Sequence, residues 1–444
     1  METLDGTVVN TALPAMAAGF GSTPLALSIG ITAYLVAMAV FVPAAGWCAD
    51  RFGARSVFAT AVGAFTLASL LCGVAPTLAF FVLSRILQGI AAAFMSPVGR
   101  LVVLHETPKN RLIEAIGTIT WPGLVAPVIG PVIGGALVAV ASWRWIFFLN
   151  IPLGLAGVVL VLRFIPRRPL PTRKPFDGRG FVLTGIALAT LIEGLTRLGE
   201  RTGSQGSAGA LVALGVSCGC LAVLHARRAP APLLSLASLR VPTFFHATLG
   251  AGFASRIAIN ASPFLLPLMF QLGFGMTALQ AGVMVLIYMG GNLVMKGLTT
   301  AILRRFGFRN VLFVNGLLCA ATLLACGCLT PDISLFVIYA ALFAAGMTRS
   351  MNFTAITTLA FVDIDGDRRA SASALATMLQ QMAMVLSVAL AASALSFARS
   401  FHPQAGLLLP DFHHVWFVIA ALMAVAALDA LRLDRDVGTS TSAT

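Results

Sequence analysis

The stretch Gly46-Trp-Cys-Ala-Asp-Arg-Phe-Gly-Ala-Arg55 lies between two long apolar runs. A shortened copy returns late in the chain as Arg305-Phe-Gly-Phe-Arg309. The copies are 254 residues apart, since Arg51 corresponds to Arg305. The second copy indicates that the chain repeats its own plan, and it also shows where the copies differ: Arg304 stands where the first copy has Asp50.

A second pair of matches has the same offset. Gly19-Phe-Gly21 recurs as Gly273-Phe-Gly275, and Thr23 recurs as Thr277. Independent matches at one offset predict two related halves. In a membrane protein, such halves are typical of a transporter.

The composition indicates that this chain lies in a lipid bilayer. Of 444 residues, 58% are hydrophobic and only 10% are charged, and the mean hydropathy is +0.94. A soluble globular chain carries about 25% charged residues. The apolar runs are about 20 residues long and do not alternate, so they predict helices across a lipid bilayer rather than a barrel.

The net charge of +13 does not indicate a nucleic-acid partner, because the basic residues lie in short loops between the apolar runs. Twenty of the 29 Lys and Arg residues fall on the side of the 48–55 loop and four on the opposite side. The positive-inside rule therefore predicts that this loop and both termini are cytoplasmic, in a multi-pass protein of the cell inner membrane.

The hydropathy pattern predicts fourteen transmembrane helices. The predicted spans are 3–20, 25–47, 56–75, 77–104, 112–140, 145–163, 180–198, 207–225, 243–271, 277–303, 310–329, 333–357, 370–397 and 414–431. They form an N-terminal six-helix bundle (1–163), a cytoplasmic linker with a two-helix insert (164–241) and a C-terminal six-helix bundle (242–436). We expect residues 437–444 to be a disordered tail.

Five motifs, in order along the chain, resemble those of the fourteen-span drug:proton antiporters (EmrB/QacA type) of the major facilitator superfamily. They are Leu4-Asp-Gly-Thr-Val-Val-Asn-Thr-Ala-Leu-Pro14, the loop 46–55, Arg85-Ile-Leu-Gln-Gly89, Gly130-Pro-Val-Ile-Gly-Gly135 and Ser142-Trp-Arg-Trp-Ile-Phe-Phe-Leu-Asn-Ile-Pro-Leu-Gly154. Within this branch, Pro97-Val-Gly-Arg100 and Lys296 resemble multidrug permeases of the MdtD and HsrA kind.

Members of the branch carry more apolar residues before the first-span aspartate. The first helix is therefore expected to be truncated, with Asp5 too near its cytoplasmic end.

The resemblance implies an all-α integral membrane protein with the major facilitator fold. It also implies proton-coupled export of small amphiphilic compounds by alternating access. Such a protein needs no cofactor beyond the proton gradient and is expected to be monomeric. Proton-coupled import of a small, possibly anionic metabolite is the alternative, which the fifth-span motif disfavours.

The loop 46–55 and its copy are candidates for a conformational latch. Glycines allow the tight turn and close helix packing, and Asp50 could accept from backbone N–H groups of the next helix and pair with Arg51 or Arg55. A simple charged turn is the other interpretation. The latch residues are Gly46, Asp50, Arg51, Gly53, Arg55, Arg305, Gly307 and Arg309.

Asp5 and Arg85 are the candidates for proton coupling. An ionisable group inside the bilayer is costly, so its presence predicts a function. A motion that changes the distance between Asp5 and Arg85 could load and release a proton, because a nearby cation stabilises the carboxylate. A fixed ion pair that only holds two helices together is the alternative.

Span five carries the candidate antiporter hinge: Gly130, Pro131, Gly134 and Gly135. Proline bends a helix, and glycines four residues apart allow close helix contact. The resemblance implies that this helix prevents leak. Ordinary packing of small residues is the other reading.

Three cations lie in the spans of the second half: Arg256, Lys296 and Arg349. We expect no acidic residue in those spans to pair with them. Unpaired cations in a bilayer need water, backbone carbonyls or a bound anion. The hypothesis is an electropositive substrate cavity that favours neutral or anionic amphiphiles, with Asn260, Tyr288, Asn292 and Asn352 as further polar contacts.

Other classes of function find less support. Cys218-Gly-Cys220 and Cys326-Gly-Cys328 are not metal pairs, because residues i and i+2 of a helix point about 200° apart, so no metal site is predicted. No convergent nucleophile, base or metal set indicates an enzyme, and no loop is long enough for a sensor domain. The sequence thus predicts a transporter.

Overall fold

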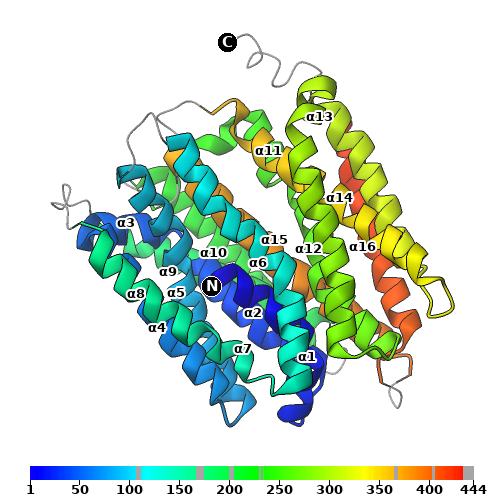
Figure 1. Ribbon diagram of the computed structural model, residues 1–444. Helices are drawn as coiled ribbons and strands as arrows, with labels where there is room; N and C mark the ends of the chain where they lie inside the picture. The colour runs from blue at the N-terminus through cyan, green and yellow to red at the C-terminus, as the bar shows by residue number, and fades with distance from the viewer. Residues whose placement is uncertain are drawn as a thin grey trace. The chain divides into compact units, whose positions relative to one another are not determined.

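A computed structural model describes residues 1–106, 112–166, 175–199, 205–229, 232–233, 235–364, 369–402 and 406–433 (Figure 1). These residues form helices joined by short turns, and no β-strand occurs among them. The chain divides into two compact units. The first comprises Met1–Glu193 and Ala210–Leu234, and the second comprises Gly194–Gly209 and Ser235–Thr444.

The helices follow the apolar runs of the sequence. In the first part of the chain they are α1 (Glu2–Gly19), α2 (Pro24–Phe41), α3 (Ala44–Phe52), α4 (Ala54–Gly73), α5 (Leu78–Glu106), α6 (Leu112–Val140), α7 (Trp145–Phe148), α8 (Asn150–Phe164), α9 (Gly178–Gly199) and α10 (Gln205–Arg228). After the short η2 (Leu236–Arg240) follow α11 (Pro242–Thr248), α12 (Ala251–Leu268), η3 (Met269–Gly273), α13 (Ala278–Cys326), α14 (Leu335–Val362), α15 (Arg369–Arg399), α16 (Leu409–Asp429) and η5 (Ala430–Arg432).

Eleven helical segments of the described chain are long and apolar enough to cross a membrane, so this count does not confirm fourteen spans. The difference arises at three places. α1 is not among the eleven, α6 contributes only the shorter apolar segment Val125–Val140, and α13 is counted once although it covers two predicted spans. Within α13, Gly307 has non-helical angles (φ 72°, ψ 163°) and separates two helices.

Outward-facing apolar side chains show what surrounds these helices. On α8, Leu155, Val159 and Phe164 are 60%, 62% and 70% exposed. A soluble protein rarely exposes contiguous apolar surface of this kind. The exposed face of α8 fits a hydrocarbon environment.

The internal repeat is visible in the backbone. Among the described residues, positive φ angles occur at four positions, all glycine: Gly21 (61°), Gly53 (86°), Gly275 (69°) and Gly307 (72°). They form two pairs at the offset of 254 residues that the sequence motifs show. The two halves therefore repeat their chain reversals as well as their sequence.

The helix starts repeat in the same way. Thr23 caps α2 by accepting from the backbone N–H of Ala26, and Thr277 caps α13 by accepting from that of Gln280. A threonine cap satisfies an N–H group that has no partner within its helix. Each half thus begins its second long helix with the same local interaction.

Gly307→Ala should destabilise the protein by about 1–3 kcal/mol, because its backbone conformation is accessible almost only to glycine. Gly297→Ala is the matched control on α13, since a Cβ there would meet no atom within 4 Å. Thermal unfolding in detergent, followed by tryptophan fluorescence, measures both. Equal midpoints for the two variants would contradict the argument.

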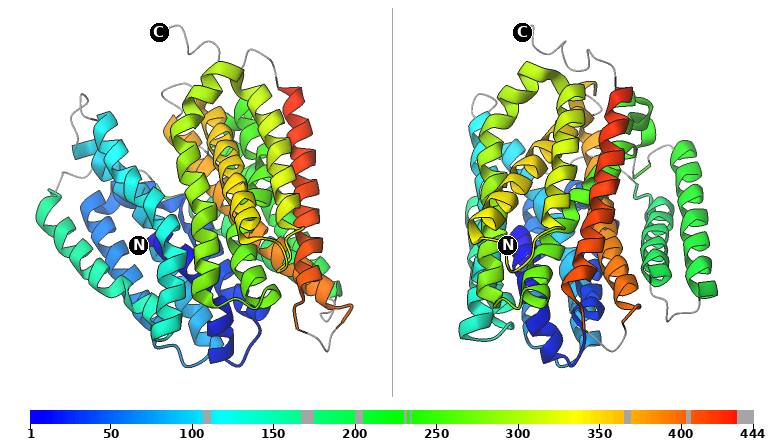
Figure 2. Two further views of the ribbon diagram at one scale, coloured as in Figure 1. Left: turned by 45° about the vertical axis from the view of Figure 1, so that its right-hand side comes forward. Right: turned by 90° about the vertical axis from the view of Figure 1, so that its right-hand side faces the viewer.

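The insert helices α9 and α10 lie side by side (Figure 2), and within the first unit α9 packs on α2 while the segment just before it contacts α3. Phe181 contacts Phe41 at 5.2 Å between ring centroids, and Phe176 contacts Trp47 at 4.7 Å. Gly215 allows the pair to approach closely, because a Cβ there would lie 2.8 Å from the backbone nitrogen of Leu191. The insert is therefore attached to the first unit by specific contacts.

Asp177 ties the ends of this helix pair together. It accepts from the backbone N–H of Gly180 (2.9 Å), from His225 Nε2 (2.7 Å) and from the N–H of Leu233 (3.1 Å). Burial raises the pKa of the Asp177 carboxyl, but these hydrogen bonds outweigh it and hold the pKa below its ordinary value. The carboxylate thus stays charged at neutral pH.

Some predictions concern residues outside the described part of the chain. They are most of the basic linker (167–174), the polar tail (437–444) and the basic loop residues Lys109 and Arg111.

Candidate functional site

Asp5 is the centre of a buried polar cluster in the first unit. Its Oδ2 accepts from Arg85 Nη1 at 2.6 Å, and its Oδ1 accepts from Gln88 Nε2 at 3.1 Å and from Asn150 Nδ2 at 3.0 Å. The Asp5 and Arg85 side chains are 0% and 1% exposed. One carboxylate therefore joins α1, α5 and α8.

Arg85 is held from several sides. It donates through Nε to the carbonyl of Gly30 (3.3 Å) and through Nη1 to Gln88 Oε1 (2.6 Å). Its guanidinium lies 4.1 Å from the ring centroid of Tyr34, a cation–π contact. A charge buried this fully needs such partners, because one left unpaired would be costly.

The sequence analysis brought Asp5 and Arg85 together but missed their neighbours. Gln88 also donates to Ser69 Oγ at 2.8 Å and thereby extends the cluster to α4. Both Gln88 and Asn150 stand inside motifs that the sequence analysis singled out, yet no role was assigned to them. The signal was a polar amide within an apolar span.

Asp5 lies in the first turn of α1, which begins at Glu2, as its position in the sequence implies. Asp5 is 2% exposed, and its partner Arg85 lies seven residues inside α5. Glu2, one turn earlier, accepts from Ser96 Oγ at 2.6 Å. The carboxylate is therefore buried by its partners on α5 and α8, although it stands in the first turn of its helix.

The predicted hinge glycines lie against the helix that carries Asp5. A Cβ at Gly130 would lie 2.3 Å from Thr7 Oγ1, and one at Gly134 would lie 2.9 Å from the carbonyl oxygen of Val8. Pro131 and Gly135 of the same helix are buried. α6 and α1 thus meet through glycines one turn from the carboxylate.

The first latch copy agrees with the sequence prediction at one residue only. Gly53 makes the reversal between α3 and α4. A Cβ at Gly46 would meet open space, so close packing does not explain that glycine. Asp50 is exposed and neither caps α4 nor pairs with Arg51 or Arg55, contrary to expectation, because it lies on the outer face of α3.

The partner of Arg55 is the end of another helix. Arg55 Nη2 donates to the carbonyl of Leu162 on α8. Carbonyls near a helix C-terminus lack intrahelical donors and carry partial negative charge, so a cation is favourable there. In the second copy Gly307 makes the reversal, Arg305 stacks near Phe306 at 5.6 Å, and Arg309 is half-buried.

Six of the seven predicted cavity residues lie on facing stripes of three helices in the second unit. Arg256 and Asn260 are one turn apart on α12, and Tyr288, Asn292 and Lys296 follow one another at four-residue spacing on α13. Arg349 begins a similar stripe on α14, which continues through Phe353 and Thr357. Residues four apart share a helix face, so the stripes can meet.

Neutral acceptors surround the three cations. Arg256 donates to Gln380 Oε1 (3.1 Å) and Thr357 Oγ1 (3.3 Å), and Lys296 donates to Thr354 Oγ1 (3.1 Å). Arg349 donates to the carbonyl of Ile259 (3.2 Å) and to Asn260 Oδ1 (3.4 Å). None of the ion pairs between described residues includes one of these three cations.

One acidic residue does occur in a predicted span of this half, which corrects the expectation. Asp429 is the last residue of α16, and it contacts Arg432 at 2.9 Å and His246 at 3.6 Å. Its position at the helix end keeps it from the three cations.

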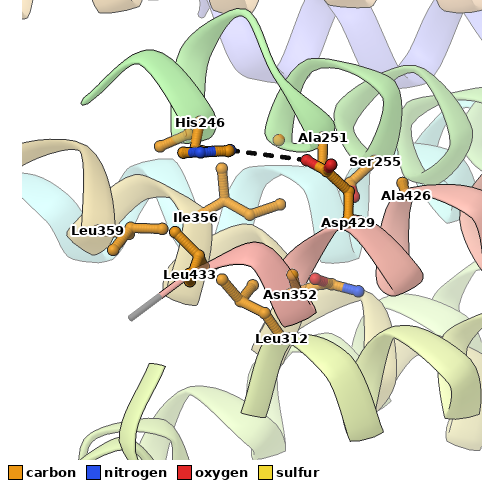
Figure 3. Close-up of a pocket in the computed structure, with 13 residues that line it drawn as sticks. His246, Ala251, Ser255, Leu312, Asn352, Ile356, Leu359, Ala426, Asp429 and Leu433 are labelled. Atoms are coloured by element: carbon orange, nitrogen blue, oxygen red, sulfur yellow. Dashed lines mark ion pairs between the residues drawn. The ribbon is translucent and has the colours of Figure 1, made fainter. Parts of the chain in front are cut away.

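Asn352 is the predicted cavity residue that the structure places elsewhere. It lines a separate small pocket with His246, Asp429 and Leu312 (Figure 3). Its Nδ2 contacts Met423 Sδ at 4.0 Å. The neighbouring Phe353 faces the cations instead.

The comparison of this chain with protein families identifies its fold. The model of the family described as Major Facilitator Superfamily matches residues 1–388. This chain belongs to that superfamily. It is therefore a multi-pass membrane protein of a transporter family, as the all-helical structure and its apolar helices require.

Curated relatives extend over nearly the whole chain. A Klebsiella pneumoniae (strain 342) protein named "Putative multidrug resistance protein MdtD" is 38% identical over 99% of this chain and 94% of its own length. The Citrobacter koseri protein of the same name is 36% identical over 98% and 93%.

Solved structures share the fold at low identity. The xylose transporter XylE from E. coli, in an inward open conformation, has a TM-score of 0.63 at 13% identity and covers 99% of this chain and 98% of its own. A POT family transporter in complex with 5-aminolevulinic acid has a TM-score of 0.70 at 14% identity, with 98% and 94% covered. These likenesses concern the fold alone.

Proposed function

We propose that this chain exports small amphiphilic compounds across the inner membrane in exchange for protons, by alternating access. Asp5 carries the proton, and Arg85 controls when the carboxylate can accept it. The observation that carries this proposal is the buried carboxylate between α1, α5 and α8, with Arg85 at 2.6 Å.

The hydrogen bonds to Asp5 depend on how three helices are placed. Its three donors, from Arg85, Gln88 and Asn150, all stabilise the carboxylate. A shift of α1 against α5 or α8 removes donors and favours the neutral acid. Gly130 and Gly134 place α6 directly on α1, so a movement of α6 is transmitted to the helix of Asp5.

The relatives and the fifth-span motif support export as the direction of transport. The curated relatives are named for multidrug resistance, which fits removal of compounds from the cell. We propose fourteen transmembrane helices: six-helix bundles at 1–163 and 242–436, and a linker with a two-helix insert at 164–241. Both termini are cytoplasmic, the protein is monomeric, and neither a cofactor nor enzymatic chemistry takes part.

Proton movement in proteoliposomes tests the proposal. Purified protein is reconstituted with a pH dye inside, and amphiphilic compounds are added on one side. Antiport moves protons in the direction opposite to the compound. A compound that enters from outside should therefore make the vesicle interior more alkaline, whereas a symporter would acidify it. Protons that follow the compound would instead establish import, and no coupled movement with any compound would refute both.

The two copies of the loop motif support a conformational latch. Gly53 and Gly307 hold equivalent reversals in the two halves, and Arg55 holds the end of α8. We propose that these contacts change as the protein changes its facing. Arg51, Arg305 and Arg309 belong to the same device.

A further inference from the structure

The basic cluster of the second unit has no acidic partner among the described residues. We define it as Arg256, Lys296 and Arg349, together with Phe353, whose ring contacts the first two. Arg256 Cζ lies 5.4 Å and Lys296 Nζ lies 5.6 Å from the centroid of Phe353. Two cations thus approach one ring within a single helix bundle.

The described residues of the second unit do not neutralise this cluster. Every hydrogen bond that the cluster makes within the described residues goes to a hydroxyl, an amide or a backbone carbonyl. The acidic side chains of the described second unit that make contacts lie at helix ends. Asp363 accepts from Thr243, Asp411 from the N–H of Leu408, and Asp429 contacts Arg432. A bound anion can supply the counter-charge that the described residues of this unit do not provide.

The cluster also keeps hydrogen-bonding capacity. A guanidinium has five N–H donors and an ammonium has three. Arg256 and Arg349 each use two of their donor atoms and Lys296 makes one bond in the described structure. Lys296 and Arg349 are half-buried, whereas Arg256 is 4% exposed. Spare donors on partly accessible cations are what an anionic group requires.

We propose that this basic cluster binds the anionic head of the transported compound, so that the substrates are amphiphilic organic anions, carboxylates or sulfonates. The inference rests on the proposed transport function for its physiological meaning. Charge-assisted hydrogen bonds from Lys296, Arg256 and Arg349 hold the head, and Phe353 gives the apolar part a ring to contact. Lipophilic cations are excluded by repulsion from the same three groups.

Calorimetric titration of the full-length protein in detergent tests this without any transport step. The probes are 1-naphthylacetate and 1-naphthylmethylammonium, which share a ring system and differ in charge. We expect the carboxylate to bind and the ammonium not to bind. Lys296→Gln and Arg256→Gln should each weaken carboxylate binding about tenfold, the value of one charge-assisted hydrogen bond.

Two further variants control for folding and for overall charge. Lys296→Arg keeps the charge and should retain binding within a few-fold. Arg399→Gln removes one positive charge at the end of α15 and should leave binding unchanged. Equal binding of both probes, no carboxylate binding, or binding insensitive to Lys296→Gln and Arg256→Gln would overturn the proposal.

The two proposals fail in different ways. If proton movement cannot be observed but carboxylate binding depends on Lys296 and Arg256, the antiport proposal fails and the anion site stands. If cations drive proton movement and the carboxylate does not bind, the anion site fails and the antiport stands.

Discussion

Asp5→Asn should reduce compound-driven proton movement in proteoliposomes to the level of protein-free vesicles. The amide has nearly the same shape as the carboxylate but cannot carry a proton in this exchange. Arg85 loses its charged partner at 2.6 Å, while Gly30 and Gln88 still accept from it. Internal pH, read by the trapped dye after addition of the compound, is the measurement.

A second readout separates proton coupling from structure. Exchange of labelled for unlabelled compound across the membrane needs alternating access but no net proton transfer. Asp5→Asn should retain this exchange, whereas a variant that only destroys packing loses both activities. Loss of exchange together with proton movement would support the simple ion-pair interpretation of Asp5 and Arg85.

Glu2→Gln is the matched control for Asp5→Asn. Glu2 lies one turn earlier on α1, is also a carboxylate, and contacts Ser96 rather than the cluster around Arg85. Its neutralisation should leave coupled proton movement close to that of the unchanged protein. A loss as large as that of Asp5→Asn would show that the position of the carboxylate does not matter.

The repeat and the contact between Asp5 and Arg85 could be predicted from the sequence because each depends on few residues. An offset of 254 residues between glycine motifs predicted equivalent turns, and the positive φ angles of Gly21, Gly53, Gly275 and Gly307 have the same offset. Asp5 and Arg85 were paired because isolated charges in apolar spans have few possible partners. These predictions rested on the backbone preference of glycine and on the small number of charged residues in the apolar spans.

Features that depend on helix rotation could not be read in this way. Successive residues of a helix point about 100° apart, so Asn352 and Phe353 cannot both face the cations. The sequence favoured Asn352 because it is polar, but the structure turns Phe353 toward Arg256 and Lys296. The same uncertainty hid Gln88 and Asn150, whose contact with Asp5 depends on how α5 and α8 are rotated.

The latch motif shows a different limit. Asp50 and Arg55 are close in sequence, which favoured a local pair. The reversal at Gly53 separates them and brings Arg55 to the carbonyl of Leu162, 107 residues later in the chain. Sequence proximity predicts contacts within one helix, not across a turn with an unusual φ angle.

Glycines where α13 and α14 cross allow the two helices to approach closely. This brings Arg349 of α14 near Tyr288 and Lys296 of α13. On α14, a Cβ at Gly346 would lie 1.8 Å from the carbonyl oxygen of Tyr288, and on α13 one at Gly291 would lie 2.0 Å from that of Phe343. In the first half, a Cβ at Gly89 would lie 2.3 Å from the carbonyl oxygen of Tyr34. Tyr34 and Tyr288 are again 254 residues apart, so both halves use glycine at equivalent crossings.

Gly346→Val should be the most destabilising of the substitutions considered, by about 3 kcal/mol or more. The new side chain meets backbone, which cannot move without separating two helices, and overpacking of this kind typically costs about 1–3 kcal/mol or more. Gly290→Val is the matched control next to Gly291, because a Cβ there meets no atom within 4 Å. Thermal unfolding in detergent compares them.

Since Arg349 lies one turn after Gly346, the milder Gly346→Ala should also weaken 1-naphthylacetate binding before it unfolds the protein. Stability and binding equal to those of Gly290→Ala would show that the crossing does not hold the basic cluster in place.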